Sequence, residues 1–421
     1  MEITIRNSSL DGSVRAPPSK SCTHRALFCA ALAEGESRIH SPLTCDDTLA
    51  TAQALSKLGV RTSWNDGHAN VARHGELKEP SGEIFCGESG TTLRFMTAIC
   101  ATTPHQAEIS GRSSLLRRPV ESLAIALGKL GADCKTNHGY PPVRVKGPIH
   151  GGSVEVPGGI SSQYVSALLL AAPLAKSPLE ITVIGRLESR SYVEMTVEMQ
   201  SKFGVQIDAA DDMTRFHSEN QVYCASDVEV EGDWSSAAFL LAASAIAGEN
   251  VRVEGLVQDT IQADQYLLSI LKRMNARVNT DPSSVTVEKS RLEPIEVDIS
   301  DSPDLFPVVC ALCAVADGVS KVTGIRRLRI KESDRVLAMS NGLKEMGVKT
   351  RESHDSLTIS GQSILRGATI DPHRDHRIAM AFAALGLCTN EIKIVDGECV
   401  GKSYPSFWKD LRALGADVIV A

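Results

Sequence analysis

A short apolar pattern recurs six times along the chain, at intervals of about 70 residues. In five copies a leucine stands three residues before a second large apolar residue, and in the third copy Gln200 takes its place. A glycine or asparagine then follows, at Gly59, Gly131, Gly204, Asn275, Gly347 and Gly415. This pattern predicts the last turn of an amphipathic helix, ended by a residue in the left-handed conformation before a strand begins.

The other half of each repeat is an alanine-rich helix that is apolar on nearly all sides. These helices begin near Ser21, Gly90, Ser161, Ser235, Pro303 and Asp375. A helix without a polar face is expected to be buried, whereas the lysines and glutamates of the second helices predict one exposed face. Each repeat therefore predicts the order βαβαββ, and the chain an α/β protein. Because 421 residues exceed the size of one ordinary core, we expect two similar domains of three repeats.

The composition narrows the class of protein. A net charge of −7 argues against a nucleic-acid partner. The longest apolar runs, such as 165–175, are about half a membrane span, and no signal or transit segment is seen, so we expect a cytoplasmic protein that binds no membrane. The 11 cysteines predict no disulfide framework, and the Cys310/Cys313 pair is interpreted as two inert core thiols. The histidines show no metal-ligand spacing, so no metal is expected.

Cations gather where the helices are predicted to begin. They are Lys20, Arg25, Arg94, Arg117, Arg118, Lys331, Arg335, Arg374, Arg377 and Lys402. A cation at a helix N-terminus opposes the helix dipole by about 0.3–1 kcal/mol, so this concentration predicts a bound anion such as phosphate or carboxylate. The alternative for individual members is solvation, or pairing with Glu88, Asp334 or Asp375.

Two carboxylates stand among these cations. Asp304 follows a proline at the entrance of an apolar helix, and Glu332 lies between Lys331 and Arg335. Either carboxylate is a candidate general acid or base, with a plain helix-capping role as the alternative for Asp304. The glycines at 397 and 401 resemble a phosphate-binding P-loop, but three residues separate them instead of four, so no nucleotide site is predicted.

Eight ordered motifs make the whole chain resemble the 5-enolpyruvylshikimate-3-phosphate synthase family of enolpyruvyl transferases. They are PPSKSCTHRAL from Pro17, GTTLR from Gly90, RRP from Arg117, SSQY from Ser161, SPD from Ser302, RIKESDR from Arg329, DHRIAM from Asp375 and GKSYP from Gly401. The resemblance implies the family's inside-out α/β barrel architecture. One domain would span 14–229, the other 1–13 with 230–421, and the active site would lie in a cleft that closes between them.

The family transfers the enolpyruvyl group of phosphoenolpyruvate to the 5-hydroxyl of shikimate 3-phosphate, releasing phosphate through a tetrahedral addition–elimination intermediate. The reaction belongs to the shikimate pathway toward chorismate and the aromatic amino acids, and it uses no metal or organic cofactor. The resemblance implies catalytic roles for Lys20, Asp304 and Glu332, with Asp304 at the 5-hydroxyl and Glu332 at the methylene carbon. We expect a monomer whose partners are these two small molecules.

The resemblance also implies two sets of binding residues. Those for shikimate 3-phosphate are Lys20, Ser21, Arg25, Ser161, Ser162, Gln163, Ser189, Tyr192, Asp304, Arg327 and Lys331. Those for phosphoenolpyruvate are Lys20, Gly90, Arg118, Gln163, Arg335, Arg377 and Lys402.

Two stretches depart from the family pattern. The family often reads Asn-Ala-Gly-Thr where this chain has Glu88-Ser89-Gly90-Thr91, so Glu88 either changes the phosphoenolpyruvate site or faces solvent. The family often has an asparagine where this chain has Arg327, so that contact to the shikimate phosphate would be made differently.

Two other functions are weighed against this one. The first is the related enolpyruvyl transferase that acts on UDP-N-acetylglucosamine, which typically carries a catalytic cysteine before an Arg-Pro. Here the corresponding stretch, 113–119, reads SSLLRRP and has no cysteine. The second is a non-catalytic repeat protein that binds polyanions, which accounts for the cations but not for Asp304 and Glu332 among them.

Overall fold

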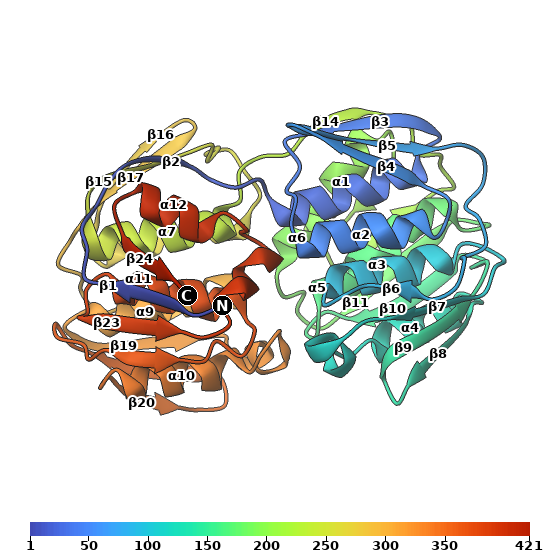
Figure 1. Cartoon of the computed structure of the whole chain (residues 1–421). Helices are drawn as coiled ribbons and strands as arrows, with labels where there is room; N and C mark the ends of the chain where they lie inside the picture. Colours follow the sequence, from blue (N-terminus) through green and yellow to red (C-terminus); the bar gives the residue numbers. More distant parts are fainter. The chain divides into compact units, whose positions relative to one another are not determined.

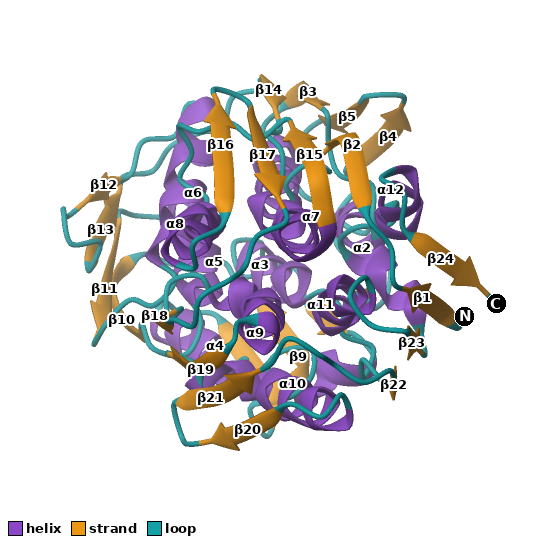
Figure 2. Cartoon of the chain, turned by 90° about the vertical axis from the view of Figure 1, so that its left-hand side faces the viewer, coloured by secondary structure: helices purple, strands orange, loops and turns teal.

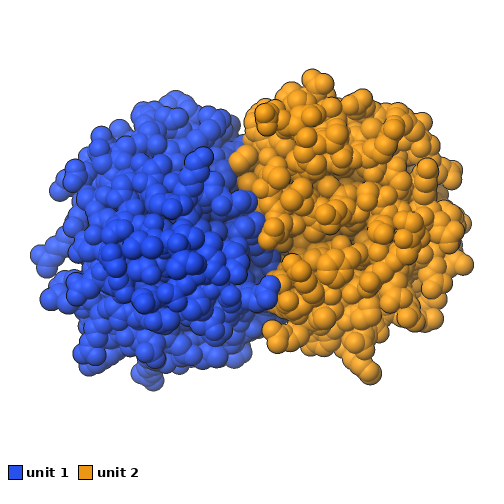
Figure 3. Space-filling model, in the orientation of Figure 1, with its two compact units in different colours: residues 1–17, 231–421 blue, residues 18–230 orange.

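The computed structural model describes all 421 residues and divides into two compact units (Figure 3). Unit 1 is Met1–Pro17 with Glu231–Ala421, and unit 2 is Pro18–Val230. The first boundary falls a few residues later than the sequence-based boundary after residue 13. The reason is that the strand Leu10–Arg15 pairs within unit 1, so the chain leaves that unit only afterwards.

Unit 2 contains six α-helices and twelve strands (Figure 1). The helices are α1 (Lys20–Leu32), α2 (Asp46–Ser56), α3 (Gly90–Cys100), α4 (Glu121–Lys129), α5 (Ser162–Ala171) and α6 (Arg190–Lys202). The strands are β3 (Gly35–His40), β4 (Arg61–Asn65), β5 (His68–Arg73), β6 (Ile84–Phe85), β7 (Ala107–Ser110), β8 (Asp133–Asn137), β9 (Tyr140–Lys146), β10 (Gly152–Pro157), β11 (Leu179–Ile184), β12 (Asp208–Ala209), β13 (Arg215–Ser218) and β14 (Asp227–Glu229). Short 3₁₀ helices are η1 (Ser113–Arg117) and η2 (Ala172–Leu174).

Unit 1 likewise contains six α-helices and twelve strands. Its helices are α7 (Trp234–Ala247), α8 (Leu267–Arg273), α9 (Phe306–Val315), α10 (Arg335–Glu345), α11 (His376–Gly386) and α12 (Phe407–Ala413). The strands are β1 (Ile3–Arg6), β2 (Leu10–Arg15), β15 (Gly248–Glu254), β16 (Arg277–Asp281), β17 (Ser284–Glu288), β18 (Glu296–Asp298), β19 (Gly318–Thr323), β20 (Lys349–Glu352), β21 (Ser356–Gly361), β22 (Ala368–Ile370), β23 (Glu391–Ile394) and β24 (Asp417–Val420). The 3₁₀ helices are η3 (Ala263–Tyr266), η4 (Pro303–Leu305), η5 (Arg326–Ile330) and η6 (Gly397–Lys402).

The strands form six separate four-stranded sheets, three in each unit, and none closes into a barrel. Their orders are β14-β3-β5-β4, β6-β7-β9-β8 and β10-β11-β13-β12 in unit 2, and β16-β17-β15-β2, β18-β19-β21-β20 and β22-β23-β1-β24 in unit 1. Every sheet combines one parallel pair with two antiparallel pairs, as β10, β11, β13 and β12 illustrate. The predicted α/β class and sixfold βαβαββ repetition are confirmed.

Strands from distant parts of the sequence complete three of the sheets. β1 pairs with both β23 and β24, so the N-terminal strand closes the last repeat. β2 lies parallel to β15, and β14 lies parallel to β3. Each unit therefore keeps three complete sheets although the chain passes between the units twice.

The apolar helices are buried, as their sequences predict. All residues of α7 are buried, and α9 and α11 are buried almost throughout. Figure 2 shows these three helices side by side within the sheets of unit 1. In unit 2, α1, α3 and α5 have the same place in the repeat and the same burial. None of the helices combines the length and apolar character that a membrane crossing requires.

Each of the six helix-ending residues adopts the left-handed backbone conformation that the sequence predicts. Their φ angles are 86° at Gly59, 101° at Gly131, 79° at Gly204, 65° at Asn275, 86° at Gly347 and 104° at Gly415. The two cysteines of α9 are fully buried, and burial raises the pKa of Cys313 to about 12, as expected of inert core thiols.

Candidate active site

The first helices begin where the sequence predicts, and side chains cap most of them. Ser19 caps α1, Ser89 caps α3 and Ser161 caps α5, while Asp233 caps α7 and Asp375 caps α11. The candidate residues therefore lie in first turns of buried helices, where the unpaired backbone N–H groups favour anions.

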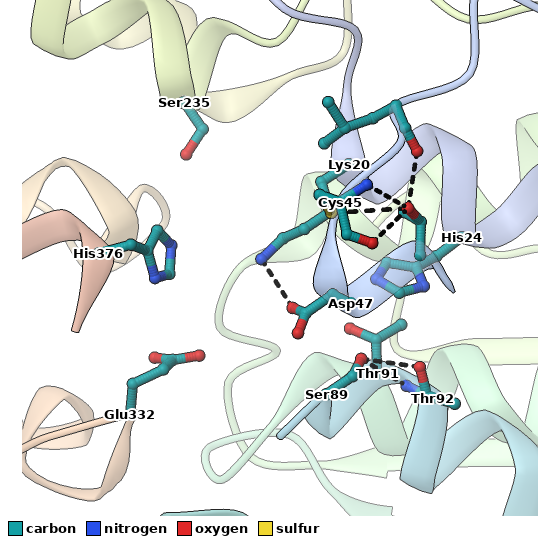
Figure 4. A network of polar contacts seen from close by, with 12 residues as sticks. Lys20, His24, Cys45, Asp47, Ser89, Thr91, Thr92, Ser235, Glu332 and His376 are labelled. Carbon is teal, nitrogen blue, oxygen red and sulfur yellow. Dashed lines mark hydrogen bonds and ion pairs between the residues drawn. The ribbon is translucent and has the colours of Figure 1, made fainter. Parts of the chain in front are cut away.

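In unit 2, Lys20 is the first residue of α1 and forms an ion pair with a carboxylate. Its Nζ lies 2.9 Å from Oδ2 of Asp47, and both side chains are largely buried, at 15% and 8% exposure (Figure 4). Asp47 is in the first turn of α2. Its role could not be predicted from the sequence, because an acidic residue in the first turn of a helix is ordinary. The pairing holds the Lys20 ammonium group in one position.

Arg25 is buried in α1, and neutral groups surround it. Its Nε donates to Oγ1 of Thr196 at 2.8 Å, Nη1 to the carbonyl of Ser21 at 2.9 Å and Nη2 to the carbonyl of Tyr192 at 2.7 Å. Its guanidinium carbon also lies 5.6 Å from the ring centre of Phe95. Burial lowers the pKa of Arg25 to about 10, which still leaves it charged at neutral pH. No carboxylate neutralises this cation.

Gln163 joins α5 to α3. Its Nε2 donates to Oγ1 of Thr91 at 2.9 Å, and its Oε1 accepts from Arg94. Arg94 also donates to the carbonyl of Pro119 at 3.1 Å and lies over the ring of Tyr164. Arg94 is one of the cations at the predicted helix starts, but no specific role was predicted for it. The structure makes it the residue that orients Gln163.

Gly90 and Arg118, both assigned to phosphoenolpyruvate, are in contact. A Cβ added at Gly90 would lie 2.7 Å from Nη1 of Arg118, so only glycine leaves room for this guanidinium. Arg118 directly follows η1 and is buried. Arg117, its neighbour, is exposed, so for Arg117 the solvated alternative holds.

The remaining residues of unit 2 lie where α5 and α6 begin. Ser161 accepts a hydrogen bond from the backbone N–H of Gln163 at 3.3 Å, and Ser162 is buried beside it. Ser189 precedes α6 with a φ of 57°, a left-handed conformation that is uncommon outside glycine and often found at functional sites. Tyr192 follows one turn later and directs its carbonyl to Arg25.

In unit 1, Arg335 is surrounded by three carboxylates. Its Nη1 donates to Oδ1 of Asp304, its Nη2 to Oε2 of Glu332 and its Nε to Oδ2 of Asp375, each at 2.8 Å. The Arg335 side chain is 1% exposed. A guanidinium so placed can orient both candidate proton-transfer carboxylates at once.

Asp304 is shared by two arginines. Its second oxygen, Oδ2, accepts from Nη2 of Arg377 at 2.9 Å, while Nη1 of Arg377 donates to Oγ of Ser235 at 2.6 Å. The alternative of a plain helix cap is wrong, because α9 has no side-chain cap and Asp304 lies in η4 before it. Asp375, at the predicted start of its helix, both caps α11 and binds Arg335.

The charges in this cluster shift one another. Burial opposes ionisation of Asp304, but Arg377, Lys331 and Arg335 outweigh it and hold the pKa of that carboxyl below its usual range. Burial lowers the pKa of Lys331 to about 8, although Asp304 acts to raise it. Burial also opposes the charge on Arg335, but Asp375, Glu332 and Asp304 raise its pKa overall. The cluster thus holds an ionised carboxylate beside a lysine that titrates near neutrality.

The other predicted cations differ in burial. Arg327 is buried and donates to the carbonyl of Ser300 at 2.6 Å, and Lys402 is buried at the last residue of η6. Arg374 is exposed. The side chain of Glu88 is only 13% exposed and lies 3.9 Å from Arg112, so it does not simply face solvent.

Known proteins match this chain over nearly its whole length. A family model described as EPSP synthase (3-phosphoshikimate 1-carboxyvinyltransferase) matches residues 5–411. The chain belongs to the EPSP synthase family. A protein of Methanocorpusculum labreanum named 3-phosphoshikimate 1-carboxyvinyltransferase is 40% identical over 422 residues, covering 99% of each chain. One of the same name from Dehalococcoides mccartyi is 42% identical over 420 residues, covering 100% of this chain and 99% of its own.

Solved structures of known proteins share the fold. The EPSP synthase of Acinetobacter baumannii superposes with a TM-score of 0.83 at 28% identity, covering 100% of both chains. The enolpyruvyl transferase NikO of Streptomyces tendae gives a TM-score of 0.80 at 17% identity, which shows the fold alone.

Proposed function

We propose that the chain transfers the enolpyruvyl group of phosphoenolpyruvate to the 5-hydroxyl of shikimate 3-phosphate and releases inorganic phosphate. The observation that carries this proposal is the buried cluster of unit 1, in which Arg335 and Arg377 hold Asp304 ionised beside Lys331 and Glu332. These carboxylates lie in the motifs to which the EPSP synthase family's proton transfers are assigned. The two candidate substrates together carry two phosphates and two carboxylates, which the cations of both units would bind.

Unit 2 supplies cations for substrate anions. Arg25 is fixed by neutral hydrogen-bond acceptors, so its charge is available to a phosphate or carboxylate. Gly90 leaves space for Arg118, and Gln163 is held by Thr91 and Arg94. Holding two anions in fixed positions converts a bimolecular step into a reaction between oriented groups and offsets their mutual repulsion.

Unit 1 supplies the proton-transfer groups. In the addition step, the C2–O bond forms between the 5-hydroxyl oxygen and phosphoenolpyruvate, the methylene carbon gains a proton and the hydroxyl loses one. In the elimination step, the C2–O bond to phosphate breaks and the methyl group returns a proton. Asp304 accepts the hydrogen bond of the 5-hydroxyl, and Glu332 exchanges the proton at carbon. Lys20 shares the protons of the bound anion. The expectation that both units enclose one closing site stays a prediction.

Phosphate release tests the proposal against its alternatives. The protein is incubated with phosphoenolpyruvate and either shikimate 3-phosphate or UDP-N-acetylglucosamine. Release only with shikimate 3-phosphate is expected, and release only with the UDP-sugar would favour the related transferase. Release with neither acceptor would contradict both transferase functions and favour the non-catalytic polyanion-binding protein. Glu332→Gln and Lys20→Ala are expected to lose most turnover while retaining the wild-type unfolding temperature, and wild-type turnover in both would refute their roles.

We further propose that the protein works as a monomer in the cytoplasm. The expected result is a sedimentation mass near 45.1 kDa that does not change with protein concentration. A concentration-dependent mass would overturn the monomer.

A further inference from the structure

A chain of hydroxyl groups crosses the interior of unit 2 from α1 to the start of α3. Nδ1 of His24 lies 2.8 Å from Oγ1 of Thr51, which lies 2.6 Å from Oγ1 of Thr92. Thr92 in turn donates to Oγ of Ser89 at 2.7 Å (Figure 4). All four residues are at most 1% exposed. The mechanism described above uses none of them.

Each hydroxyl has a single hydrogen, and this fixes the direction of the chain. The hydrogen of Thr92 goes to Ser89, so between Thr51 and Thr92 the hydroxyl of Thr51 must be the donor. The other acceptor near Thr51, the carbonyl of Asp47, is at 3.4 Å and competes poorly. With its hydrogen committed, Thr51 can only accept from His24.

The environment of His24 supports the same direction. Its Nε2 is buried and has no hydrogen-bond partner. If Nδ1 carries the proton, Nε2 is left as an unpaired acceptor. If Nε2 carries the proton, a buried N–H donor is left unpaired, which is rarer in protein interiors. Burial lowers the pKa of His24 to about 3, so the ring is neutral and carries one proton. Nδ1 therefore donates to Thr51.

The chain ends with a hydroxyl hydrogen that has no acceptor. Ser89 accepts from the hydroxyl of Thr92 and, as the cap of α3, from its backbone N–H at 3.2 Å. No protein group accepts the hydrogen of Ser89 itself. Ser89 directly precedes Gly90, which contacts Arg118. The spare donor therefore lies beside residues that are predicted to bind phosphoenolpyruvate.

We propose that Ser89 donates its hydrogen to an anionic oxygen of phosphoenolpyruvate, with His24 as the positioning residue that orients the donor through Thr51 and Thr92. The proposal rests on the proposed function. The EPSP synthase family often has alanine where Ser89 stands, and members with that alanine lack this donor. The same hydroxyl thus caps α3 as an acceptor and binds substrate as a donor.

Three substitutions at Ser89 separate these two uses. Ser89→Ala removes the cap and the donor, Ser89→Gly removes the donor but caps nearly as well as serine, and Ser89→Thr keeps both. Initial rates of phosphate release are measured against each substrate in turn, with thermal unfolding of every variant. We expect Ser89→Ala and Ser89→Gly to raise KM for phosphoenolpyruvate about ten-fold or more, with KM for shikimate 3-phosphate and kcat little changed. Ser89→Thr should stay near wild type.

Two substitutions at His24 test the direction of the chain. Asn can donate from a nitrogen close to the position of Nδ1, whereas Leu fills the space without a donor. We expect His24→Leu to raise KM for phosphoenolpyruvate several-fold and His24→Asn to restore most of the loss.

The outcomes distinguish this proposal from the proposed function. If the wild-type protein releases no phosphate with shikimate 3-phosphate, the proposed function fails. If the wild type is active and Ser89→Gly keeps its KM for phosphoenolpyruvate, the donor proposal is overturned. If Ser89→Ala lowers only the unfolding temperature and leaves KM unchanged, Ser89 acts only as a helix cap. Equal KM values for His24→Leu and His24→Asn would overturn the positioning role of His24.

Discussion

The two units build the same repeats, yet two buried arginines in each unit have different kinds of partner. In unit 2, Arg25 and Arg94 donate to carbonyls, a hydroxyl and an amide. In unit 1, Arg335 and Arg377 donate mainly to carboxylates. A cation held by neutral groups keeps its charge for a ligand, whereas one held by carboxylates fixes those carboxylates in place. The same scaffold thus gives these arginines two electrostatic settings, one made of neutral partners and one made of carboxylates.

The largest expected effect comes from replacing an arginine of each unit by methionine. Arg335→Met leaves three carboxylates without their shared partner, so we expect a loss of about 3–5 kcal/mol in the free energy of unfolding, measured with denaturant. Arg25→Met leaves only neutral acceptors behind and removes a buried charge. Its free energy of unfolding should therefore change by less than about half of the loss expected for Arg335→Met. Both variants should lose turnover.

Equal destabilisation by these two variants would contradict the comparison. A further check is the pH dependence of Arg335→Met. Its orphaned carboxylates should bind protons more tightly in the folded state than in the unfolded state, so its stability should improve as the pH is lowered toward the pKa of an ordinary carboxyl group. Arg25→Met should show no such improvement.

The second effect is a loss of substrate binding at alkaline pH. Burial lowers the pKa of Lys331 to about 8, while Arg25 keeps its proton to about pH 10. If Lys331 binds the phosphate of shikimate 3-phosphate, kcat/KM for that substrate should fall up to about ten-fold per pH unit above pH 8. Lys331→Arg should remove this limb, because arginine stays charged. A wild-type profile that is flat to pH 9 would contradict the assignment.

The same shift predicts how stability depends on pH. The pKa of Lys331 is about 8 in the folded chain, whereas an ordinary lysine, as in the unfolded chain, has a pKa of 10.5. Between these two pH values the unfolded chain therefore binds more protons than the folded chain. The contribution of Lys331 to stability therefore rises with pH across that window. Lys331→Met should abolish the rise in a series of denaturant titrations.

The repeats could be predicted from local sequence, but the hydrogen-bond partners of the site residues could not. The left-handed glycines and the capped helix starts follow from properties of neighbouring residues, which the sequence displays directly. Arg25 instead finds Thr196 and the carbonyl of Tyr192, which lie 171 and 167 positions away, and no local pattern announces them. Asp47 was missed for a related reason, since a first-turn acid also serves the helix dipole.

A smaller effect is expected from Gly90→Ala in unit 2. The new Cβ would lie 2.7 Å from Nη1 of Arg118, and this flexible end of the side chain would move rather than the backbone. We expect KM for phosphoenolpyruvate to rise about ten-fold and the unfolding temperature to stay unchanged. The matched control is Gly128→Ala in α4, where a Cβ meets no atom within 4 Å. Equal kinetics in both variants would show that Arg118 does not bind this substrate.

The smallest effect compares corresponding positions of the two units. Ser235 and Thr91 are each the second residue of a buried helix, and each hydroxyl accepts one hydrogen bond, from Arg377 at 2.6 Å and from Gln163 at 2.9 Å. A bond from a charged donor is the stronger of the two. Ser235→Ala should therefore raise KM for phosphoenolpyruvate about five-fold and Thr91→Ala less, in steady-state rates of phosphate release. If Thr91→Ala had the larger effect, the orientation of Gln163 in unit 2 would matter more for phosphoenolpyruvate binding than the orientation of Arg377 in unit 1.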